Sequence, residues 1–261
     1  VDSDKWRQYA EKKSGVMKWV YQREHRYLPE FERKAAAQFN ASLFVSGHEA
    51  ELFKQMAPES QEKIGAVSNG VDLEYFSDTS QLKNPYPNES PVLVFTGAMD
   101  YWANVDAVQW FCDEVFPLIK RIAGSAEFYI VGINPSSQVI ELGKRDGVTV
   151  TGRVEDIRPY LHFAKVAVAP LQIARGIQNK VLEAMANSTA VVATSAAMEG
   201  ISIPEDLQVL IQDKPEQFSN KVVELLNTNE SELVGARCRK VVEDRYSWDA
   251  CLQELDSILD E

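Results

Sequence analysis

The chain is poor in the residues that form disulfides and metal sites. Its 261 residues include three cysteines and three histidines, and no two cysteines stand in a C-x-x-C pair. Free thiols in a reducing cytoplasm are therefore favoured over disulfides or zinc. No histidine pairs with Cys, Asp or Glu at metal-ligand spacing. We accordingly expect no metal site and no cofactor.

Several well-known motifs are also missing. There is no apolar run of the roughly 20 residues that cross a bilayer, and no secretory signal at the start. A G-x-G-x-x-G, a G-x-x-x-x-G-K-[ST] and a G-x-S-x-G are absent from the chain. These absences disfavour a nicotinamide dehydrogenase, a P-loop ATPase and a serine hydrolase.

Composition points to a globular protein with uneven charge. Hydrophobic residues make up 45% and charged residues 25%, which excludes a disordered chain. The net charge of -12 argues against a nucleic-acid partner. Residues 1–40 nevertheless hold nine basic and six acidic side chains, so we expect the two ends to meet different partners. Because the chain begins at Val1 in what reads as the exit from a strand, we expect a piece of a longer protein.

The larger part of the chain, residues 92–245, alternates short apolar strands with amphipathic helices. Buried strands that alternate with helices indicate a doubly wound, parallel, Rossmann-like α/β sheet with both faces covered. Helices are predicted over residues 104–121, 136–145, 155–163 and 177–187. The predicted strands are Val92–Phe95, Phe128–Val131, Val148–Thr151, Val166–Ala169, Ala190–Ala193 and Val209–Ile211.

The flanking regions are simpler. Residues 1–80 are predicted to be a mostly helical remnant of an amino-terminal domain, with Gly15 and Pro29 separating helical segments and short strands at 42–46 and 64–67. The proline-rich residues 81–91 read as a linker. Residues 215–260 read as three acidic helices. The last of these, over residues 246–261, is expected to pack back toward the first domain.

Ligands of such sheets bind beyond the carboxyl ends of the strands. The strand that ends at Pro170 leads into a helix predicted to open near Gln178, so the N–H groups of residues 176–179 could hold an anion. Glu183, one to two turns inside, could bind the hydroxyls of a ribose. Arg175 and Lys180 add positive charge. The alternative, an ordinary helix start with a solvated Glu183, remains open on spacing alone.

Two further loops carry weaker signals. Thr151-Gly152-Arg153 follows a strand and offers a tight turn with an arginine suited to phosphate, although a surface arginine is the more common case. Gly97, after the first strand of the sheet, would let a ligand approach the backbone.

In this order the pieces resemble the carboxyl half of retaining glycosyltransferases of family 4, which have the two-domain GT-B architecture. The resemblance covers about residues 42–261. It rests on Val67-Ser-Asn-Gly-Val-Asp72 with Tyr75-Phe76, Val94-Phe-Thr-Gly97, Tyr129-Ile-Val-Gly132, Val150-Thr-Gly-Arg153, Lys180-Val-Leu-Glu-Ala-Met-Ala186, Val191-Val-Ala-Thr194 and Tyr246-Ser-Trp248. The run Ala174–Glu183 is most similar to the bacterial sugar transferases associated with exosortase-type exopolysaccharide systems.

The resemblance implies roles for individual residues. Glu183 matches the second glutamate of the family's E-x7-E motif, which holds the donor ribose. Arg153, with Val154 beside it, matches the basic residue near the donor phosphates. Gly97 matches the glycine that the diphosphate approaches. The remaining donor-binding candidates share one loop and helix start, and they are Gly176, Ile177, Gln178, Asn179 and Lys180.

Two positions depart from the family pattern. The first glutamate of E-x7-E is replaced by Arg175, and the lysine common in the loop after Gly97 is missing. The hypothesis that follows is that Arg175 or Lys180 neutralises the phosphates instead. Catalytic roles are accordingly expected for Glu183, Arg153 and Arg175.

The implied reaction moves a sugar from a nucleotide-sugar donor to a hydroxyl, with retention and without a metal. The acceptor, a sugar or a lipid-linked sugar, would be met mainly by the amino-terminal domain. Two alternatives stay open: a non-catalytic nucleotide-sugar-binding module and a sugar-nucleotide epimerase on the same architecture.

Residues 5–34 combine basic and aromatic side chains, as in helices that lie on anionic membranes. Packing of these aromatic side chains on the rest of the amino-terminal domain is the competing explanation. The expected location is the cytoplasm, at the inner face of the membrane if the helix contacts lipid.

Overall fold

The computed structural model divides the chain into two compact units. It describes residues 3, 6–7, 10–11, 14–77, 79–174, 176–228 and 230–259, without the side chains of 254, 257 and 259. The first unit comprises Val1–Asn69, Arg175–Ile177 and Cys251–Glu261, and the second comprises Gly70–Ala174 and Gln178–Ala250. Residues 81–91, which the sequence suggested as a linker, lie inside the second unit.

The second unit is built on a five-stranded parallel sheet, which confirms the predicted fold class. Its strand order is β5-β4-β3-β6-β7. The strands are β3 (Val92–Thr96), β4 (Glu127–Val131), β5 (Val148–Gly152), β6 (Val166–Ala169) and β7 (Ala190–Ala193). Every residue of β3, β6 and β7 is buried, as expected for a parallel sheet covered on both faces.

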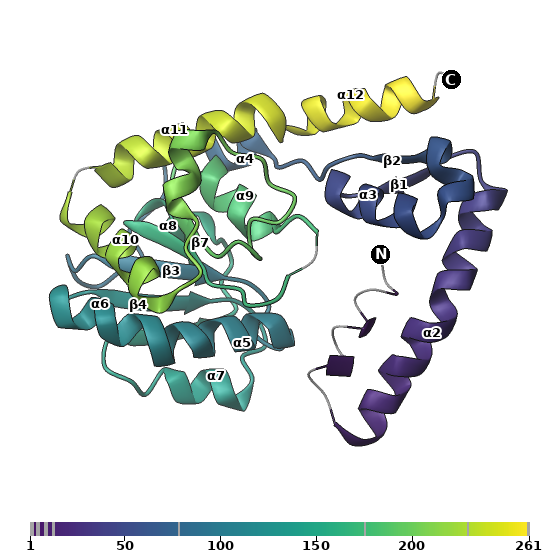
Figure 1. Ribbon diagram of the computed structural model, residues 1–261. Helices are drawn as coiled ribbons and strands as arrows, with labels where there is room; N and C mark the ends of the chain where they lie inside the picture. Colours follow the sequence, from purple (N-terminus) through teal and green to yellow (C-terminus); the bar gives the residue numbers. More distant parts are fainter. Residues whose placement is uncertain are drawn as a thin grey trace. The chain divides into compact units, whose positions relative to one another are not determined.

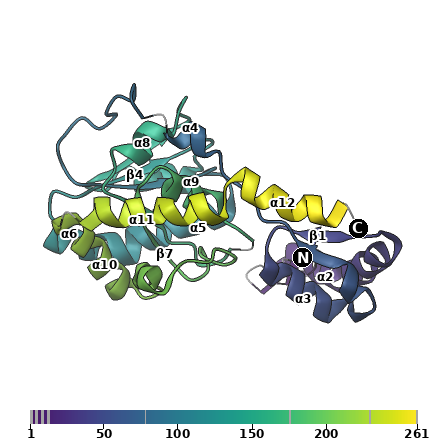
Figure 2. The ribbon, with the colours of Figure 1, turned by 90° about the horizontal axis from the view of Figure 1, so that it is seen from above.

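Helices cover both faces of this sheet (Figures 1 and 2). One layer packs α5, the π-helical turn η2, α6, α7 and α10 together. The other brings α11 against α9 and β7, with α4 beside α9. The bounds are α4 (Leu73–Ser77), α5 (Trp102–Trp110), η2 (Phe111–Val115), α6 (Phe116–Ile122), α7 (Ser137–Leu142), α8 (Arg158–His162), α9 (Asn179–Ala186), η3 (Glu205–Leu210), α10 (Pro215–Asn227) and α11 (Glu230–Arg245).

An aromatic cluster fills the core under α5–α6. Phe111 lies 4.6 Å from Phe128 and 5.9 Å from Phe218, measured between ring centroids. All three side chains are fully buried. At about 2–3 kcal/mol for each buried phenyl ring, this cluster contributes a large share of the stability that holds the helices to the sheet.

The predicted strand over residues 209–211 is wrong. Residues Glu205–Leu210 form the 3-10 helix η3, and only Ile211 bridges β7, at Ala193. Leu207 and Leu210 are buried three residues apart, which is a helical spacing, and Pro204 sets the start of the turn. The helix predicted over 104–121 is interrupted by η2, which ends two residues before Pro117, a residue with no N–H to donate to the preceding turn.

The first unit contains the long helix α2 (Gly15–Gln38) and a two-stranded parallel sheet of β1 (Ser42–Phe44) and β2 (Ile64–Ala66). Helix α3 (Gly47–Met56) and the 3-10 helix η1 (Pro58–Lys63) complete it, and α12 (Trp248–Leu259) ends in it. A small core gathers the buried residues Ala36, Ala50, Phe53, Ala57 and Ile64.

Pro29 was expected to separate two helical segments, and this is wrong, because α2 runs through it. A proline removes one backbone donor, and on this half-exposed helix water can hydrate the carbonyl that loses its partner. Gly15 does mark a break, since it begins α2 with a φ of +66°. The three predicted acidic helices of the tail are confirmed as α10, α11 and α12.

Candidate functional site

The carboxyl ends of β3, β4 and β5 are joined by their own backbone. The N–H of Gly97 donates to the carbonyl of Val131 at 3.0 Å, and the N–H of Gly132 donates to the carbonyl of Gly152 at 3.2 Å. Three glycine turns therefore lie side by side at one edge of the sheet. The predicted residue Gly97 is at this edge, with a φ of +157°.

The side chain of Lys180, which is on α9, lies against the Gly97 turn. Its Nζ donates a hydrogen bond to Oδ1 of Asn104 and lies 4.4 Å from the centroid of the Phe95 ring. A Cβ at Gly97 would stand 3.2 Å from the same nitrogen. Burial lowers the pKa of Lys180 to about 7, and the nearby carboxylate of Glu183 offsets this only in part.

Asn104 is a site residue that the sequence analysis did not single out. It stands in the first turn of α5, is 5% exposed, and its Nδ2 donates to the carbonyl of Ala98 at 2.9 Å. One amide thus joins the loop after β3 to the ammonium on α9. The sequence did offer one signal, because Asn104 is a polar residue on the buried face of the apolar first turn of α5. A buried polar side chain is normally hydrogen-bonded, and here Asn104 is.

Glu183 lies one turn after Lys180 on α9. Burial raises the pKa of its carboxyl group, while the positive charge of Lys180 acts in the opposite direction. The structure therefore places Lys180 at the Gly97 turn, with Glu183 one turn further along α9. Their arrangement offers a cation beside the backbone of the Gly97 turn and a carboxylate on the same helix.

The start of α9 is only partly as predicted. The helix begins at Asn179, with Gln178 as its N-cap in extended conformation, one residue later than the expected opening. Gly176 and Ile177 group with the first unit, where a Cβ at Gly176 would stand 3.3 Å from a methyl of Val45 and 3.5 Å from a carboxylate oxygen of Glu49. Arg175 lies outside the described residues.

Arg153 and Val154 follow β5, with Arg153 exposed and Val154 half-buried. An ion pair holds the next turn of this loop, since Arg158 contacts the carboxylate of Asp156 at 2.7 Å. The guanidinium of Arg158 also lies 4.1 Å from the centroid of the Tyr75 ring on α4. These contacts hold the loop that carries Arg153 against α4, while Arg153 itself remains exposed.

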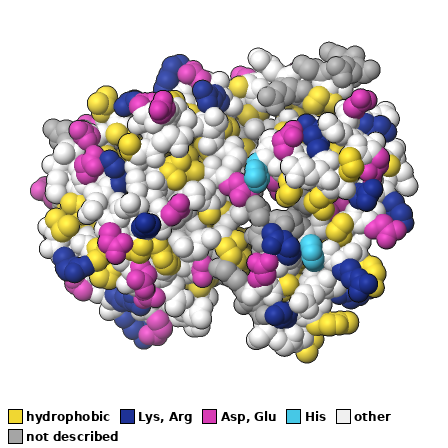
Figure 3. Space-filling view, viewed as in Figure 1, with side chains coloured by type: hydrophobic (Ala, Val, Ile, Leu, Met, Phe, Trp, Pro, Cys, Tyr) yellow, Lys and Arg dark blue, Asp and Glu magenta, His cyan; other side chains and the backbone are white. Residues whose placement is uncertain are grey.

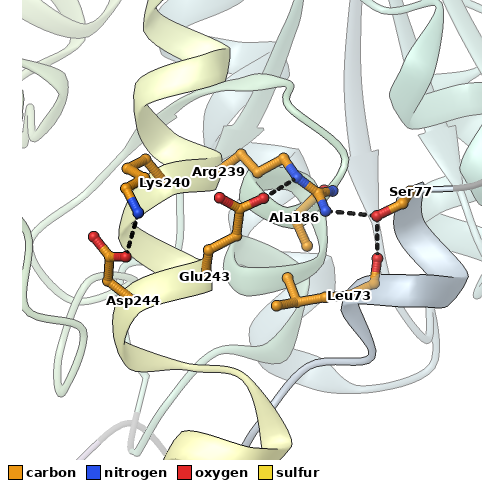
Figure 4. Close-up of polar contacts among 7 residues, drawn as sticks. All are labelled: Leu73, Ser77, Ala186, Arg239, Lys240, Glu243 and Asp244. Carbon is orange, nitrogen blue, oxygen red and sulfur yellow. Dashed lines mark hydrogen bonds and ion pairs between the residues drawn. The ribbon is translucent and has the colours of Figure 1, made fainter.

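The far end of α9 is held by Arg239 of α11 (Figure 4). Its guanidinium donates to the carbonyl of Ala186 and, at 2.5 Å, to Oγ of Ser77 on α4. The Oγ of Ser77 donates in turn to the carbonyl of Leu73 at 2.5 Å. A positive charge at a helix C-terminus complements the helix dipole. Arg239 thus fixes the helix that presents Lys180 and Glu183.

Within the described part of the chain, no cluster of three or more His, Cys, Asp or Glu side chains is arranged to hold a metal ion. None of its helices combines the length and apolar character needed to cross a bilayer.

Residues 90–228 match a protein family described as glycosyl transferases group 1. The chain belongs to this family. The match covers β3 to α10, and so includes every strand end of the candidate site. No curated protein sequence matches the chain.

Solved structures of glycosyltransferases share the fold. A glycosyltransferase from Rickettsia africae superposes with a TM-score of 0.67 at 15% identity, over 87% of this chain and 65% of its own. Anabaena HepE, in complex with UDP and glucose, gives 0.68 at 16% identity, over 89% of this chain and 66% of its own. WaaG, a glycosyltransferase of lipopolysaccharide biosynthesis, gives 0.67 at 15% identity, over 96% and 71%. This chain therefore spans about two thirds of the length of these neighbours.

Proposed function

We propose that this chain carries the donor-binding part of a retaining glycosyltransferase of family 4, which moves a sugar from a nucleotide-sugar to a hydroxyl group. The observation that supports this most directly is Lys180 beside the Gly97 turn, with Glu183 one turn further along the same helix, in a glycosyl transferases group 1 domain. The bound UDP and glucose of the neighbour HepE agree with such a donor.

The proposed roles follow from charge and position. Glu183 accepts two hydrogen bonds from the ribose hydroxyls, because a carboxylate matches a vicinal diol. The diphosphate is faced by the backbone at the start of α9, at Gln178 and Asn179. The exposed Arg153 faces it as well. In an oxocarbenium-like transition state negative charge grows on the departing diphosphate, and fixed dipoles and cations directed at it lower the barrier.

The proposal for the acceptor rests on a sequence resemblance. The run Ala174–Glu183 resembles sugar transferases of exosortase-type exopolysaccharide systems. A sugar or lipid-linked sugar is the proposed acceptor, in polysaccharide synthesis. A longer chain that binds a nucleotide-sugar and transfers nothing would favour the non-catalytic binding module instead.

Calorimetric titration with UDP, GDP and ADP tests the donor site. We expect one of the three to bind and Glu183→Gln to weaken it at least tenfold, because a neutral amide is a poorer partner for the two hydroxyls. Glu141→Gln, on the exposed surface of α7, is the matched control and should leave binding unchanged. Equal affinity of both variants, or no nucleotide bound by this chain and by a longer one, would contradict the proposal.

We further propose that α2 contacts an anionic membrane surface. Trp19, Tyr27 and Phe31 are 64%, 58% and 68% exposed, and with Arg23 they recur every four residues, which places them on one helix face. The guanidinium of Arg26 lies 5.8 Å from the Tyr27 ring centroid. Basic and apolar side chains lie next to one another on the part of the first unit drawn in Figure 3. This pattern is typical of helices at lipid headgroups.

Liposome co-sedimentation tests the membrane contact. We expect the chain to pellet with vesicles containing 30% phosphatidylserine and to stay in solution with neutral phosphatidylcholine, since each basic side chain near an anionic surface contributes about 1 kcal/mol. Trp19→Ala with Phe31→Ala should abolish pelleting, whereas Leu233→Ala, an exposed apolar residue of α11, should not. Equal pelleting with both vesicle types would remove the electrostatic argument.

A further inference from the structure

The ammonium of Lys180 lies in surroundings that offer it little compensation for burial. From α5 it meets the neutral amide of Asn104, and from β3 the face of the Phe95 ring. The backbone of Gly97 lies against it, and on its own helix the carboxylate of Glu183 is one turn away. Of these groups only Glu183 carries a charge.

These surroundings disfavour the charged form of the Lys180 amine. A part-buried ammonium with one neutral acceptor and an aromatic ring beside it loses hydration that these contacts replace only in part, so its pKa falls, here to about 7. A phosphate group brought to the Gly97 turn would supply the missing negative charge. It would then favour the protonated amine, because an opposite charge at close range outweighs the desolvation.

We propose that Lys180 meets the donor's diphosphate alongside Arg153 and the start of α9, and that the site takes up a proton when a nucleotide-sugar binds. Asn104 is the positioning residue that holds the ammonium over the Gly97 turn. This inference rests on the proposed function. It assigns to Lys180 the neutralising charge that the sequence left open between positions 175 and 180.

Proton uptake is measured by calorimetry in pairs of buffers that differ in ionisation enthalpy. UDP-glucose, GDP-mannose and ADP-glucose are the probes, because a diphosphate diester has no ionisation of its own near neutral pH. With a pKa of about 7 for the free amine, we expect about 0.9 proton taken up per ligand at pH 8 and about half a proton at pH 7.

Substitutions separate charge from proton uptake. Lys180→Arg keeps a permanent charge and should bind without proton uptake. Lys180→Met should weaken binding at least tenfold and also take up no proton. Lys144→Met, at an exposed surface lysine paired with Glu141, is the control and should behave like the unmodified chain. Asn104→Ala removes the amide acceptor, lowers the pKa of the free amine, and should raise the uptake at pH 7 above half a proton.

The outcomes distinguish the two proposals. Uptake that is lost in both Lys180 variants supports the inference. A nucleotide-sugar that binds with the same proton count in the unmodified chain and in Lys180→Met would overturn it and leave the proposed donor site standing. No binding of any of the three probes, by this chain and by a longer one, would overturn both.

Discussion

The carbonyl oxygen of Gly97 occupies the place that a side chain on residue 132 would need. An ideal Cβ built on Gly132 lies 1.6 Å from that oxygen and 2.8 Å from the carbonyl carbon. The turn after β3 and the turn after β4 are therefore in direct backbone contact. The position of Gly97 beside Lys180 depends on residue 132 having no side chain.

Gly132→Ala should destabilise the second unit by about 1–3 kcal/mol or more, because a backbone atom cannot move aside as a side chain can. Urea denaturation followed by circular dichroism measures the loss. Gly124→Ala is the matched control, since its nearest neighbour would be a carbonyl oxygen at 3.7 Å, an ordinary contact. Equal stability of the two variants would show that the turns are not packed as described.

The sequence predicts most of the second unit for a physical reason. Strands such as β3 and β6 are short runs of apolar residues, and such runs have few structural options other than a buried strand. The error at residues 209–211 has the opposite origin. Its apolar residues are compatible with a strand and with a 3-10 helix. The three-residue spacing of the buried Leu207 and Leu210, together with Pro204 at the start, favours the 3-10 helix.

The contacts within the candidate site were predictable only between residues that are close in sequence. Lys180 and Glu183 stand three positions apart on one helix, so their proximity follows from helix geometry. The partner of Lys180 lies 76 positions away on α5, and no local pattern connects the two. The same holds for Arg239, whose contacts with Ala186 and Ser77 depend on how α11 packs against α9 and α4.

Asp156 should make stability depend on pH below neutrality. Burial opposes its charge, but hydrogen bonds from Arg158 prevail and hold the pKa of the carboxyl below its usual range. The folded state therefore gains stability above the ordinary pKa of about 4 and loses it as pH falls through the lower, folded value. Asp156→Asn should cost about 1 kcal/mol at pH 7 and progressively less as pH falls through the folded pKa of Asp156. Asp146→Asn, a mostly exposed carboxylate beside Lys120, should cost far less at pH 7.

Lys180 should also make stability rise with pH, but in a higher pH window than Asp156. Its folded pKa of about 7 lies below its ordinary 10.5, so the unfolded chain binds more protons between these values and stability rises with pH across that window. Lys180→Met removes this dependence. The gain in Tm relative to the unmodified chain should be larger at pH 7 than at pH 10, by on the order of 10 °C. The Met variant leaves Oδ1 of Asn104 unpartnered at both pH values, so only the difference between them is diagnostic. A gain independent of pH would contradict the low pKa.

Arg239 should matter more than its equally charged neighbour on α11. Both side chains form an ion pair at i,i+4, Arg239 with Glu243 and Lys240 with Asp244 (Figure 4). Only Arg239 also reaches the last turn of α9 and the hydroxyl of Ser77. Its truncation leaves a part-buried carbonyl without its donor, and such a loss costs about 1–3 kcal/mol.

Arg239→Ala should therefore lower the free energy of unfolding by about 1–3 kcal/mol, while Lys240→Ala should stay within about 0.5 kcal/mol, as an exposed pair does. Urea denaturation of both variants gives the comparison. Hydrogen exchange adds the location: amides in the last turn of α9 should exchange faster in Arg239→Ala and not in Lys240→Ala. Similar losses in the two variants, with α9 equally protected in both, would mean that the ion pair on α11 and not the contact with Ala186 gives Arg239 its role.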